Sequence, residues 1–180
     1  MKVAKGDLFS QKCDAICITT NGYYTMKGEA VMGKGVAAQA SAKWKVLKQK
    51  LGYMLNLHGS HVFIILKRSK QNDRPYYVVN FPTKKQAGKS NGKNVLRRLR
   101  NTPGFMKGDL VPGWALKADI ELIAQSAREI VELAKLRGWQ KVIIPRPGCG
   151  NGELTWAEVR AVIKPILRGP KFIVIDHIEE

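Results

Sequence analysis

Short apolar runs and longer amphipathic stretches alternate along the chain, and this alternation predicts its elements. The short runs are rich in β-branched and aromatic residues and are bounded by polar residues, glycine or proline, as is typical of strands. We predict strands over residues 2–5, 14–20, 61–67, 76–81, 141–145 and 171–176. Pro82 follows the fourth run, and we expect it to end that strand.

Three stretches predict helices. The first covers residues 35–51, with one apolar stripe formed by Val36, Ala40, Trp44, Leu47 and Leu51. The second covers residues 117–137 and stops at Gly138. Thr155 and Glu158 have the spacing of a capping box, so we expect a third helix to begin there. Strands that alternate with helices predict an α/β fold, with helices on both faces of one sheet.

One segment, residues 87–113, interrupts this alternation. It is too long for an ordinary connection, so we expect it to be either functional or mobile. Its only acidic residue is Asp109, and its basic residues are Lys89, Lys93, Arg97, Arg98, Arg100 and Lys107. Trp114 follows this segment, and we expect an exposed ring there that is able to stack on a base.

The chain as a whole is strongly basic, with 31 Lys and Arg against 14 Asp and Glu, a net charge of +17. A field of that sign attracts polyanions, of which nucleic acid is the commonest, although surface lysines also serve solubility. A length of 180 residues fits one domain, and no apolar run is long enough for a membrane span. The three cysteines are an odd number without a dense spacing pattern, and the start shows no signal-peptide pattern. Both features favour a cytoplasmic protein, which we expect to be a monomer.

The first glycine-rich segment, residues 28–37, runs into the first predicted helix. It resembles a Walker A loop, but Gly35 stands where the magnesium-binding Ser or Thr should be, which argues against nucleotide hydrolysis. Gly33, Gly35 and Ala38 match a dinucleotide fingerprint only loosely. The segment still offers backbone N–H groups and a helix N-terminus to a phosphate. The alternative is a simple turn that needs a positive φ.

A second glycine-rich segment, residues 145–154, repeats the order of strand, glycine loop and capped helix. Two such loops at one edge of a sheet suit a pyrophosphate in the crevice beyond the strand ends. Cys149 lies in this segment without an evident histidine partner that would make it a nucleophile. The other Cys and His residues lack the spacing of a zinc site, so we predict neither a metal nor a cofactor.

Five short motifs occur in the order found in macro domains, a family that binds ADP-ribose. They are Gly6-Asp7-Leu8, Thr19-Thr20-Asn21, Val31-Met32-Gly33-Lys34-Gly35-Val36-Ala37, Asn80-Phe81-Pro82-Thr83-Lys84-Lys85 and Pro147-Gly148-Cys149-Gly150. More narrowly, the chain resembles the branch that contains terminal ADP-ribose protein glycohydrolase and the DarG-type antitoxins, which strip ADP-ribose from DNA. The resemblance spans residues 1–180 and implies a single three-layer α/β/α domain with a mixed, largely parallel central sheet. Residues 87–113 look like an insertion relative to that family.

The resemblance also implies roles for individual residues. Asp7 corresponds to the aspartate that receives the adenine amino group, and Asn21 to the asparagine near the distal ribose. Lys84 corresponds to the catalytic lysine, which engages the anomeric carbon of that ribose. An amine can do so where a basic, partly desolvated pocket keeps it partly neutral. Without the resemblance, Lys84 would pass for a solvated lysine at a strand end. The implied ligand-binding residues are Asp7, Leu8, Thr20, Met32, Gly33, Lys34, Gly35, Val36, Pro147, Gly148, Cys149, Gly150, Asn151 and Gly152.

The match departs from the protein-directed enzymes at Gly152, where they carry a catalytic aspartate, and the neighbouring Glu153 is out of register. The DNA-directed branch is glycine-rich at this point and fits better. We therefore predict a glycohydrolase that cleaves the N- or O-glycosidic bond between ADP-ribose and a nucleic-acid base or a protein side chain. The cations predicted to grip nucleic-acid phosphates are Arg97, Arg98, Arg100 and Lys107.

Three alternatives stay open. One is a phosphatase that acts on ADP-ribose 1″-phosphate. Another is a module that only binds ADP-ribose or a related nucleotide, which the missing loop aspartate favours and the retained Lys84 opposes. The third is a basic RNA-binding protein in which the fold is incidental.

Overall fold

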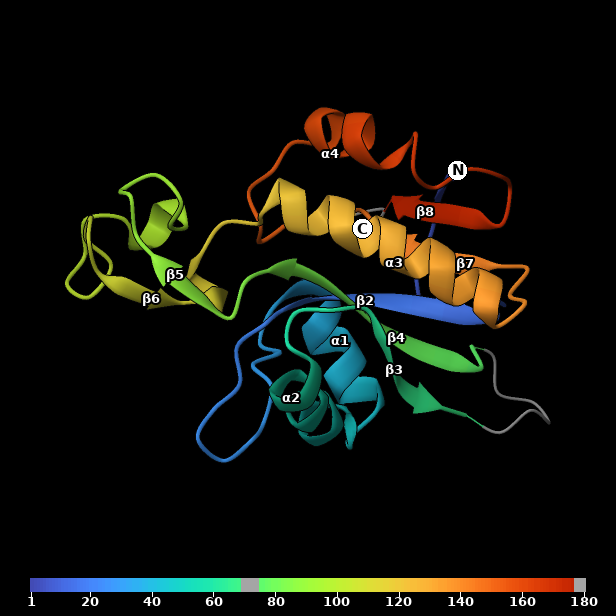
Figure 1. Cartoon of the computed structure of the whole chain (residues 1–180), viewed down its shortest axis with the longest axis horizontal. Coiled ribbons are helices and arrows are strands. Elements are labelled where there is room, and N and C mark those ends of the chain that lie inside the picture. The colour runs from blue at the N-terminus through green and yellow to red at the C-terminus, as the bar shows by residue number, and fades with distance from the viewer. Residues whose placement is uncertain (69–74, 177–180) are drawn as a thin grey trace.

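The central sheet contains the strands that the apolar runs predict (Figure 1). The structure is a computed structural model, which describes residues 1–68 and 75–176. The strands of this sheet are β1 (Lys2–Lys5), β2 (Ala15–Asn21), β3 (Phe63–Lys67), β4 (Tyr77–Lys84), β7 (Val142–Pro145) and β8 (Phe172–Asp176). They lie in the order β1-β8-β7-β2-β4-β3, and all neighbours are parallel except β3 and β4. The mixed, largely parallel sheet is therefore confirmed.

Helices cover both faces of the sheet, which confirms the three-layer α/β/α fold. They are α1 (Gly35–Lys43) and α2 (Leu47–His58) on one face, and α3 (Ile120–Leu136) and α4 (Trp156–Ile163) on the other (Figure 1). In β2, Ile16 and Ile18 join the core under the first pair, whereas Ala15 and Cys17 join the core under the second. Alternate side chains of a strand point to opposite faces, so a strand covered on both faces is apolar throughout. Among the described helices, none is long and apolar enough to cross a membrane.

The single helix predicted over residues 35–51 is wrong, because the chain leaves the helical conformation at Trp44 and begins a second helix at Leu47. Trp44 has extended backbone angles (φ −125°, ψ 94°), and its ring packs edge-on against Phe9 with 5.8 Å between centroids. The predicted stripe is nevertheless buried at Trp44, Leu47 and Leu51. No glycine or proline lies at the break. The helix is interrupted where the large side chain of Trp44 packs against Phe9.

Side-chain caps set the starts of the two later helices. α3 begins at Ile120 rather than at residue 117, because the Asp119 carboxylate accepts the N–H groups of Glu121 and Leu122. The capping box of Thr155 and Glu158 opens α4 and is confirmed.

The expectation that Pro82 ends its strand is wrong, because β4 continues through Pro82 to Lys84. The register with β2 shifts just after Thr20, and a proline is tolerated at such a bulge because the regular ladder is already interrupted there. Hydroxyl groups satisfy the carbonyls at this point. Thr83 Oγ1 donates to the Thr20 carbonyl (3.1 Å), and Ser126 Oγ of α3 donates to the Pro82 carbonyl (2.8 Å). The bulge thus carries β4 on to Lys84.

Residues 87–116 fold into a small unit, which we call the basic subdomain. Its antiparallel strands are β5 (Ala87–Lys89) and β6 (Leu110–Pro112), and its short 3-10 helices are η1 (Arg97–Leu99) and η2 (Gly113–Ala115). Its own core consists of Val95, Val111 and Leu116, with Leu99 and Phe105 packed against it. Figure 1 shows the unit at one end of the molecule, apart from the four helices. The segment is therefore a folded unit rather than an irregular connection.

We expect Ser126→Ala to destabilise the protein by about 1–3 kcal/mol, because it leaves the buried Pro82 carbonyl without a donor. Ser41→Ala is the matched control, since Ser41 is a half-buried helical serine whose hydroxyl donates to Ala38 of its own helix. Urea unfolding measures both variants. Equal midpoints for the two would contradict a specific role for the Ser126 hydrogen bond.

Candidate functional site

A cleft of about 830 Å³ opens at the carboxyl ends of β2, β4, β7 and β8. These strands are parallel, so their carboxyl ends meet at one edge of the sheet, where open α/β folds bind their ligands. The volume suits a nucleotide-sized ligand. The predicted site residues that line the cleft are Thr20, Asn21, Met32, Gly33, Lys34, Gly35, Val36, Lys84, Arg98, Gly148, Cys149, Gly150, Asn151 and Gly152.

The first loop, residues 28–37, enters α1 without a capping side chain. Lys34 occupies the N-cap position with an extended backbone and makes no side-chain cap hydrogen bond. The first N–H groups of α1 therefore remain for water or a ligand. Gly33 and Gly35 have no atom within 4 Å of the place where a Cβ would lie, and Gly35 has a φ of 55°. The loop offers open backbone and a positive helix end to an anion.

Asn21 ties the first loop to the end of β2. Its Nδ2 donates to the carbonyl of Val31 (2.9 Å), and its Oδ1 accepts the N–H of Tyr23 (3.0 Å). An asparagine side chain has two donor hydrogens and two acceptor lone pairs, so one of each is left for a ligand in the cleft. Asn21 therefore shapes the loop and still has hydrogen-bonding capacity.

The second loop, residues 145–154, packs tightly on its inner side. A Cβ at Gly152 would overlap the carbonyl oxygen of Gly148 and would lie 2.7 Å from the Cβ of Ala118. The Ala118 N–H also donates to the Gly152 carbonyl (2.9 Å). Backbone atoms cannot move aside as a flexible side chain can, so an aspartate does not fit at position 152 in this loop. This packing gives a physical reason for the departure noted in the sequence.

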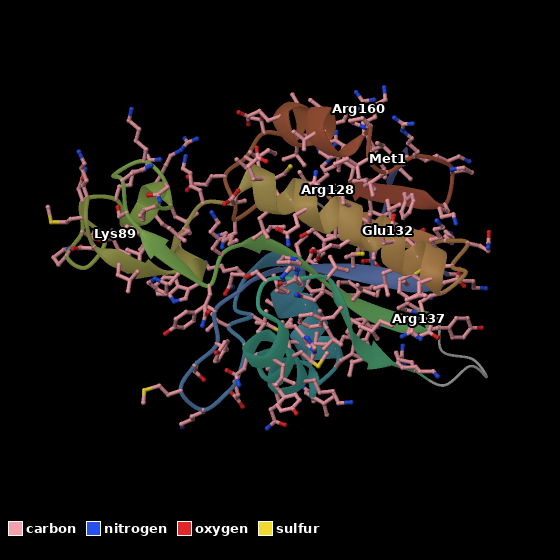
Figure 2. All side chains as sticks on the ribbon, in the orientation of Figure 1. Met1, Lys89, Arg128, Glu132, Arg137 and Arg160 are labelled. Carbon is pink, nitrogen blue, oxygen red and sulfur yellow. The ribbon has the colours of Figure 1, made fainter. Side chains whose placement is uncertain are left out.

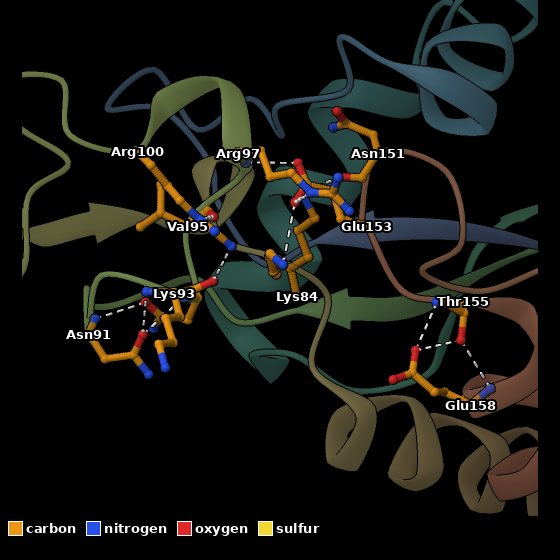
Figure 3. A network of polar contacts seen from close by, with 12 residues as sticks. Lys84, Asn91, Lys93, Val95, Arg97, Arg100, Asn151, Glu153, Thr155 and Glu158 are labelled. Atoms are coloured by element: carbon orange, nitrogen blue, oxygen red, sulfur yellow. Dashed lines mark hydrogen bonds and ion pairs between the residues drawn. The ribbon is translucent and has the colours of Figure 1, made fainter.

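Lys84 ends β4 at the cleft, and only 5% of its surface is exposed. Its Nζ donates to the carbonyl of Asn151 in the second loop (2.9 Å; Figure 3). It also donates to the carbonyl of Trp114 in η2 (3.4 Å). Burial lowers the pKa of Lys84 to about 8; Glu153 opposes this shift and Arg98 adds to it. A fraction of the amine is therefore neutral near pH 7, which is the form that acts as a nucleophile.

Four cleft residues carry side chains whose place in the site the sequence did not indicate. Trp114 is half-buried rather than exposed, and its ring packs edge-on against Phe105 (5.8 Å between centroids). Arg146 and Asp176 form an ion pair, and the Arg146 guanidinium lies 5.0 Å from the centroid of the Trp156 ring. Thr83 lines the cleft beside Lys84. For Arg146 and Asp176 the sequence did offer a signal, because Arg146 follows a predicted strand and Asp176 ends one, and ligands of α/β folds bind at strand ends. Trp114 and Thr83 had no such signal.

Three predicted ligand-binding residues do not line the cleft: Asp7, Leu8 and Pro147. Asp7 lies just beyond β1, whose last residue pairs with the cleft residue Asp176, and its carboxylate accepts the N–H of Phe9 (3.2 Å). Leu8 and Pro147 are buried. Asp7 thus lies beside the β8 end of the cleft, whereas Leu8 and Pro147 are packed in the interior of the protein.

The predicted phosphate-gripping residues differ in their surroundings. The Arg97 side chain is 78% exposed, and Lys107 is exposed as well. Arg98 lies on the rim of the cleft. Arg100 turns inward and donates from Nε and a terminal nitrogen to two carbonyls of the subdomain (3.1 and 2.7 Å), so its guanidinium holds the subdomain together.

Among the described residues, Cys149, His58 and His61 have no arrangement for nucleophilic or metal chemistry. Burial raises the pKa of Cys149 to about 11, although Arg146 opposes the shift, so its thiol stays protonated at neutral pH. His61 Nδ1 lies 2.7 Å from a carboxylate oxygen of Glu129. Within residues 1–68 and 75–176, no three His, Cys, Asp or Glu side chains are grouped to hold a metal ion.

No protein-family model and no curated protein sequence matches the chain. Solved structures do match it. The macrodomain of Thermus aquaticus DarG is 22% identical with a TM-score of 0.68, and the alignment covers 99% of this chain and 97% of that one. The macrodomain of Mycobacterium tuberculosis DarG is 19% identical with a TM-score of 0.69, covering 97% and 95%. Thermosipho africanus DarTG in complex with ADP-ribose is 21% identical with a TM-score of 0.63, covering 97% of this chain and 41% of that one.

Structural matches at 19–22% sequence identity show a shared fold. The alignments extend over nearly the whole chain, and the sheet is covered by two helices on each face. The protein has the macrodomain fold.

Proposed function

We propose that this protein binds ADP-ribose in the cleft and hydrolyses the glycosidic bond that joins ADP-ribose to a nucleic-acid or protein acceptor. The observation that carries the proposal is the buried amine of Lys84 at the β4 end of the cleft, with a pKa of about 8. The Thermosipho africanus neighbour, which was solved with ADP-ribose, supports the choice of ligand. So does the pair of glycine-rich loops that line the cleft.

The proposed ligand runs along the edge of the sheet from β8 to β4. The pyrophosphate lies between the uncapped start of α1 and the open backbone of Gly150, where N–H groups favour negative charge. The adenine lies at the β8 end, beside Asp7 and Asp176. The distal ribose then reaches the β4 end, where Asn21 and Lys84 line the cleft.

The proposed chemistry uses the neutral form of Lys84. The Nζ lone pair attacks the anomeric carbon of the distal ribose, and the bond to the acceptor breaks with its electron pair moving to the acceptor atom, which takes up a proton. Water then cleaves the ribosyl–lysine bond, releasing ADP-ribose and restoring the amine. The carbonyls of Asn151 and Trp114 orient Nζ through hydrogen bonds and carry no full negative charge that would hold the proton on the amine.

The basic subdomain supports nucleic acid as the acceptor. It borders the β4 end of the cleft through Arg98 and Trp114, and it exposes Lys93, Arg97 and Lys107 beyond that end. An acceptor attached to the distal ribose leaves the cleft at this border. Exposed cations there attract phosphates, and an indole ring offers a surface on which a base can stack.

We expect the wild type to release ADP-ribose from an ADP-ribosylated single-stranded oligonucleotide. Lys84→Ala should slow release more than about 1,000-fold, because the nucleophile is lost. Lys84→Arg should fail equally, since a guanidinium stays charged. Lys85→Ala is the matched control, because Lys85 is exposed and pairs with Asp119 outside the cleft.

Retained release by Lys84→Ala would contradict the role of the amine. If neither wild type nor variant releases ADP-ribose while both bind it in calorimetry, the protein is a binding module or a phosphatase. Incubation with ADP-ribose 1″-phosphate and analysis of the products separates these two.

The pH profile tests the protonation state. Because only the neutral amine attacks, kcat/KM should rise about tenfold per pH unit below the pKa of Lys84 and level off above about 8. The measurement is the release rate at subsaturating substrate between pH 6 and 9.5. A profile that is flat, or that falls, over this range would exclude the neutral amine as the nucleophile.

Salt dependence tests the acceptor. The triple variant Lys93→Gln, Arg97→Gln, Lys107→Gln should bind single-stranded DNA more weakly and reduce the slope of log K against log salt by about 2. The control triple variant changes Arg128, Arg137 and Arg160 to Gln, residues that Figure 2 shows along α3 and α4, away from the subdomain residue Lys89. Identical slopes for the two triple variants would refute a nucleic-acid surface on the subdomain.

A further inference from the structure

Glu153, in the second loop, has a backbone conformation that its residue type disfavours. Its φ is 59°, in the left-handed region that glycine enters at little cost. Within the described residues, the other non-glycine residue with a positive φ is Asn101, a residue type that tolerates this region. Such strain persists when the surrounding structure holds it, and it is frequent at functional sites. The contacts of the Glu153 side chain indicate what holds it.

The Glu153 carboxylate lies in the seam between the second loop and the basic subdomain (Figure 3). Its Oε1 accepts the backbone N–H of Arg97 in η1 (2.8 Å). Its Oε2 lies 3.5 Å from Nζ of Lys117 and 3.8 Å from Nε of Arg97. This second oxygen is buried and accepts no hydrogen bond from the described residues, so longer-range attraction to these cations balances its charge.

Lys84 spans the same seam. One of its carbonyl partners, Asn151, belongs to the second loop, and the other, Trp114, belongs to the subdomain. The position of Nζ therefore depends on how the loop and the subdomain are held relative to one another. Close to this seam, the N–H of Ala118, two residues beyond the subdomain, donates to the Gly152 carbonyl of the loop.

We propose that Glu153 is a positioning residue, which clamps the basic subdomain to the second loop and thereby fixes the Lys84 amine between the carbonyls of Asn151 and Trp114. The hydrogen bond to Arg97 supplies the geometry of the clamp. The charge supplies a second effect, because Glu153 and Arg98 are the charged groups that act on Lys84 from the loop and from η1. The glutamate favours the charged amine and the arginine the neutral one.

Two substitutions separate geometry from charge. Glu153→Gln keeps an oxygen for the Arg97 N–H and removes the charge, whereas Glu153→Ala removes both. Glu132→Gln, on the exposed surface of α3 (Figure 2), makes the same change in net charge far from the seam. The first measurement is the pH dependence of Lys84 acetylation by limiting acetic anhydride, followed by mass spectrometry of the Lys84 peptide. It needs no enzymatic activity.

In Glu153→Gln, the labelling midpoint of Lys84 should move to lower pH, while Glu132→Gln should leave it unchanged. The kinetic measurement rests on the proposed function. There, Glu153→Ala should lower kcat roughly ten- to a hundredfold at a pH above both midpoints, with little change in KM, because the amine is misplaced. Glu153→Gln should restore kcat at that pH.

An unchanged labelling midpoint in folded Glu153→Gln, as judged by its thermal unfolding, would overturn the electrostatic effect of Glu153. Equal kcat in Glu153→Ala and wild type would overturn the clamp. If the wild type itself releases no ADP-ribose, the proposed function fails, and the labelling experiment with Glu153→Gln still decides whether Glu153 acts on Lys84.

Discussion

The candidate site depends on the removal of one lysine amine from water. Burying an ammonium group is costly unless its hydrogen bonds are replaced, and Lys84 replaces them with main-chain carbonyls of Asn151 and Trp114. Carbonyls satisfy donors without adding the full negative charge that would keep the amine protonated. The compensation is therefore partial, and the pKa of Lys84 falls to about 8. For this arrangement to persist, the two carbonyls have to stay in place. They belong to the second loop and to the basic subdomain, which are separated in sequence and meet at the seam that contains Glu153.

This requirement makes the basic subdomain part of the site rather than an appendage. Its small core of Val95, Val111 and Leu116 gives it a shape of its own, and Arg100 closes it from within. The second loop itself leaves no room for a side chain at Gly152, because a Cβ there would meet the backbone of Gly148 and the side chain of Ala118. The cleft therefore has no carboxylate at position 152 to act beside Lys84.

Sequence patterns predicted the parts of this arrangement that rest on local chemistry. Apolar runs located every strand of the central sheet, and the glycine-rich segments located both loops of the cleft. The break at Trp44 was not predictable, because a distant contact with Phe9 accompanies it and no breaker residue is present. The passage of β4 through Pro82 depends on hydroxyls of Thr83 and Ser126, one of which lies on another element. Trp114 and Arg98 reach the cleft only because the subdomain folds back on the loop. The family resemblance gave Lys84 its proposed role, whereas its burial and partners needed the structure.

The positive charge of the subdomain has two effects that oppose one another at the amine. Arg98, on the cleft rim, favours neutral Lys84, and the same field attracts a polyanionic acceptor. A phosphate bound directly to Arg98 would cancel its charge and return the proton to the amine. Phosphates bound to Arg97, Lys93 or Lys107 lie at the exposed surface, where solvent and salt weaken their influence on a buried group. An acceptor strand is therefore compatible with the proposed catalysis by Lys84 when its phosphates occupy the outer cations and leave Arg98 free. The inward turn of Arg100 removes its guanidinium from that outer set.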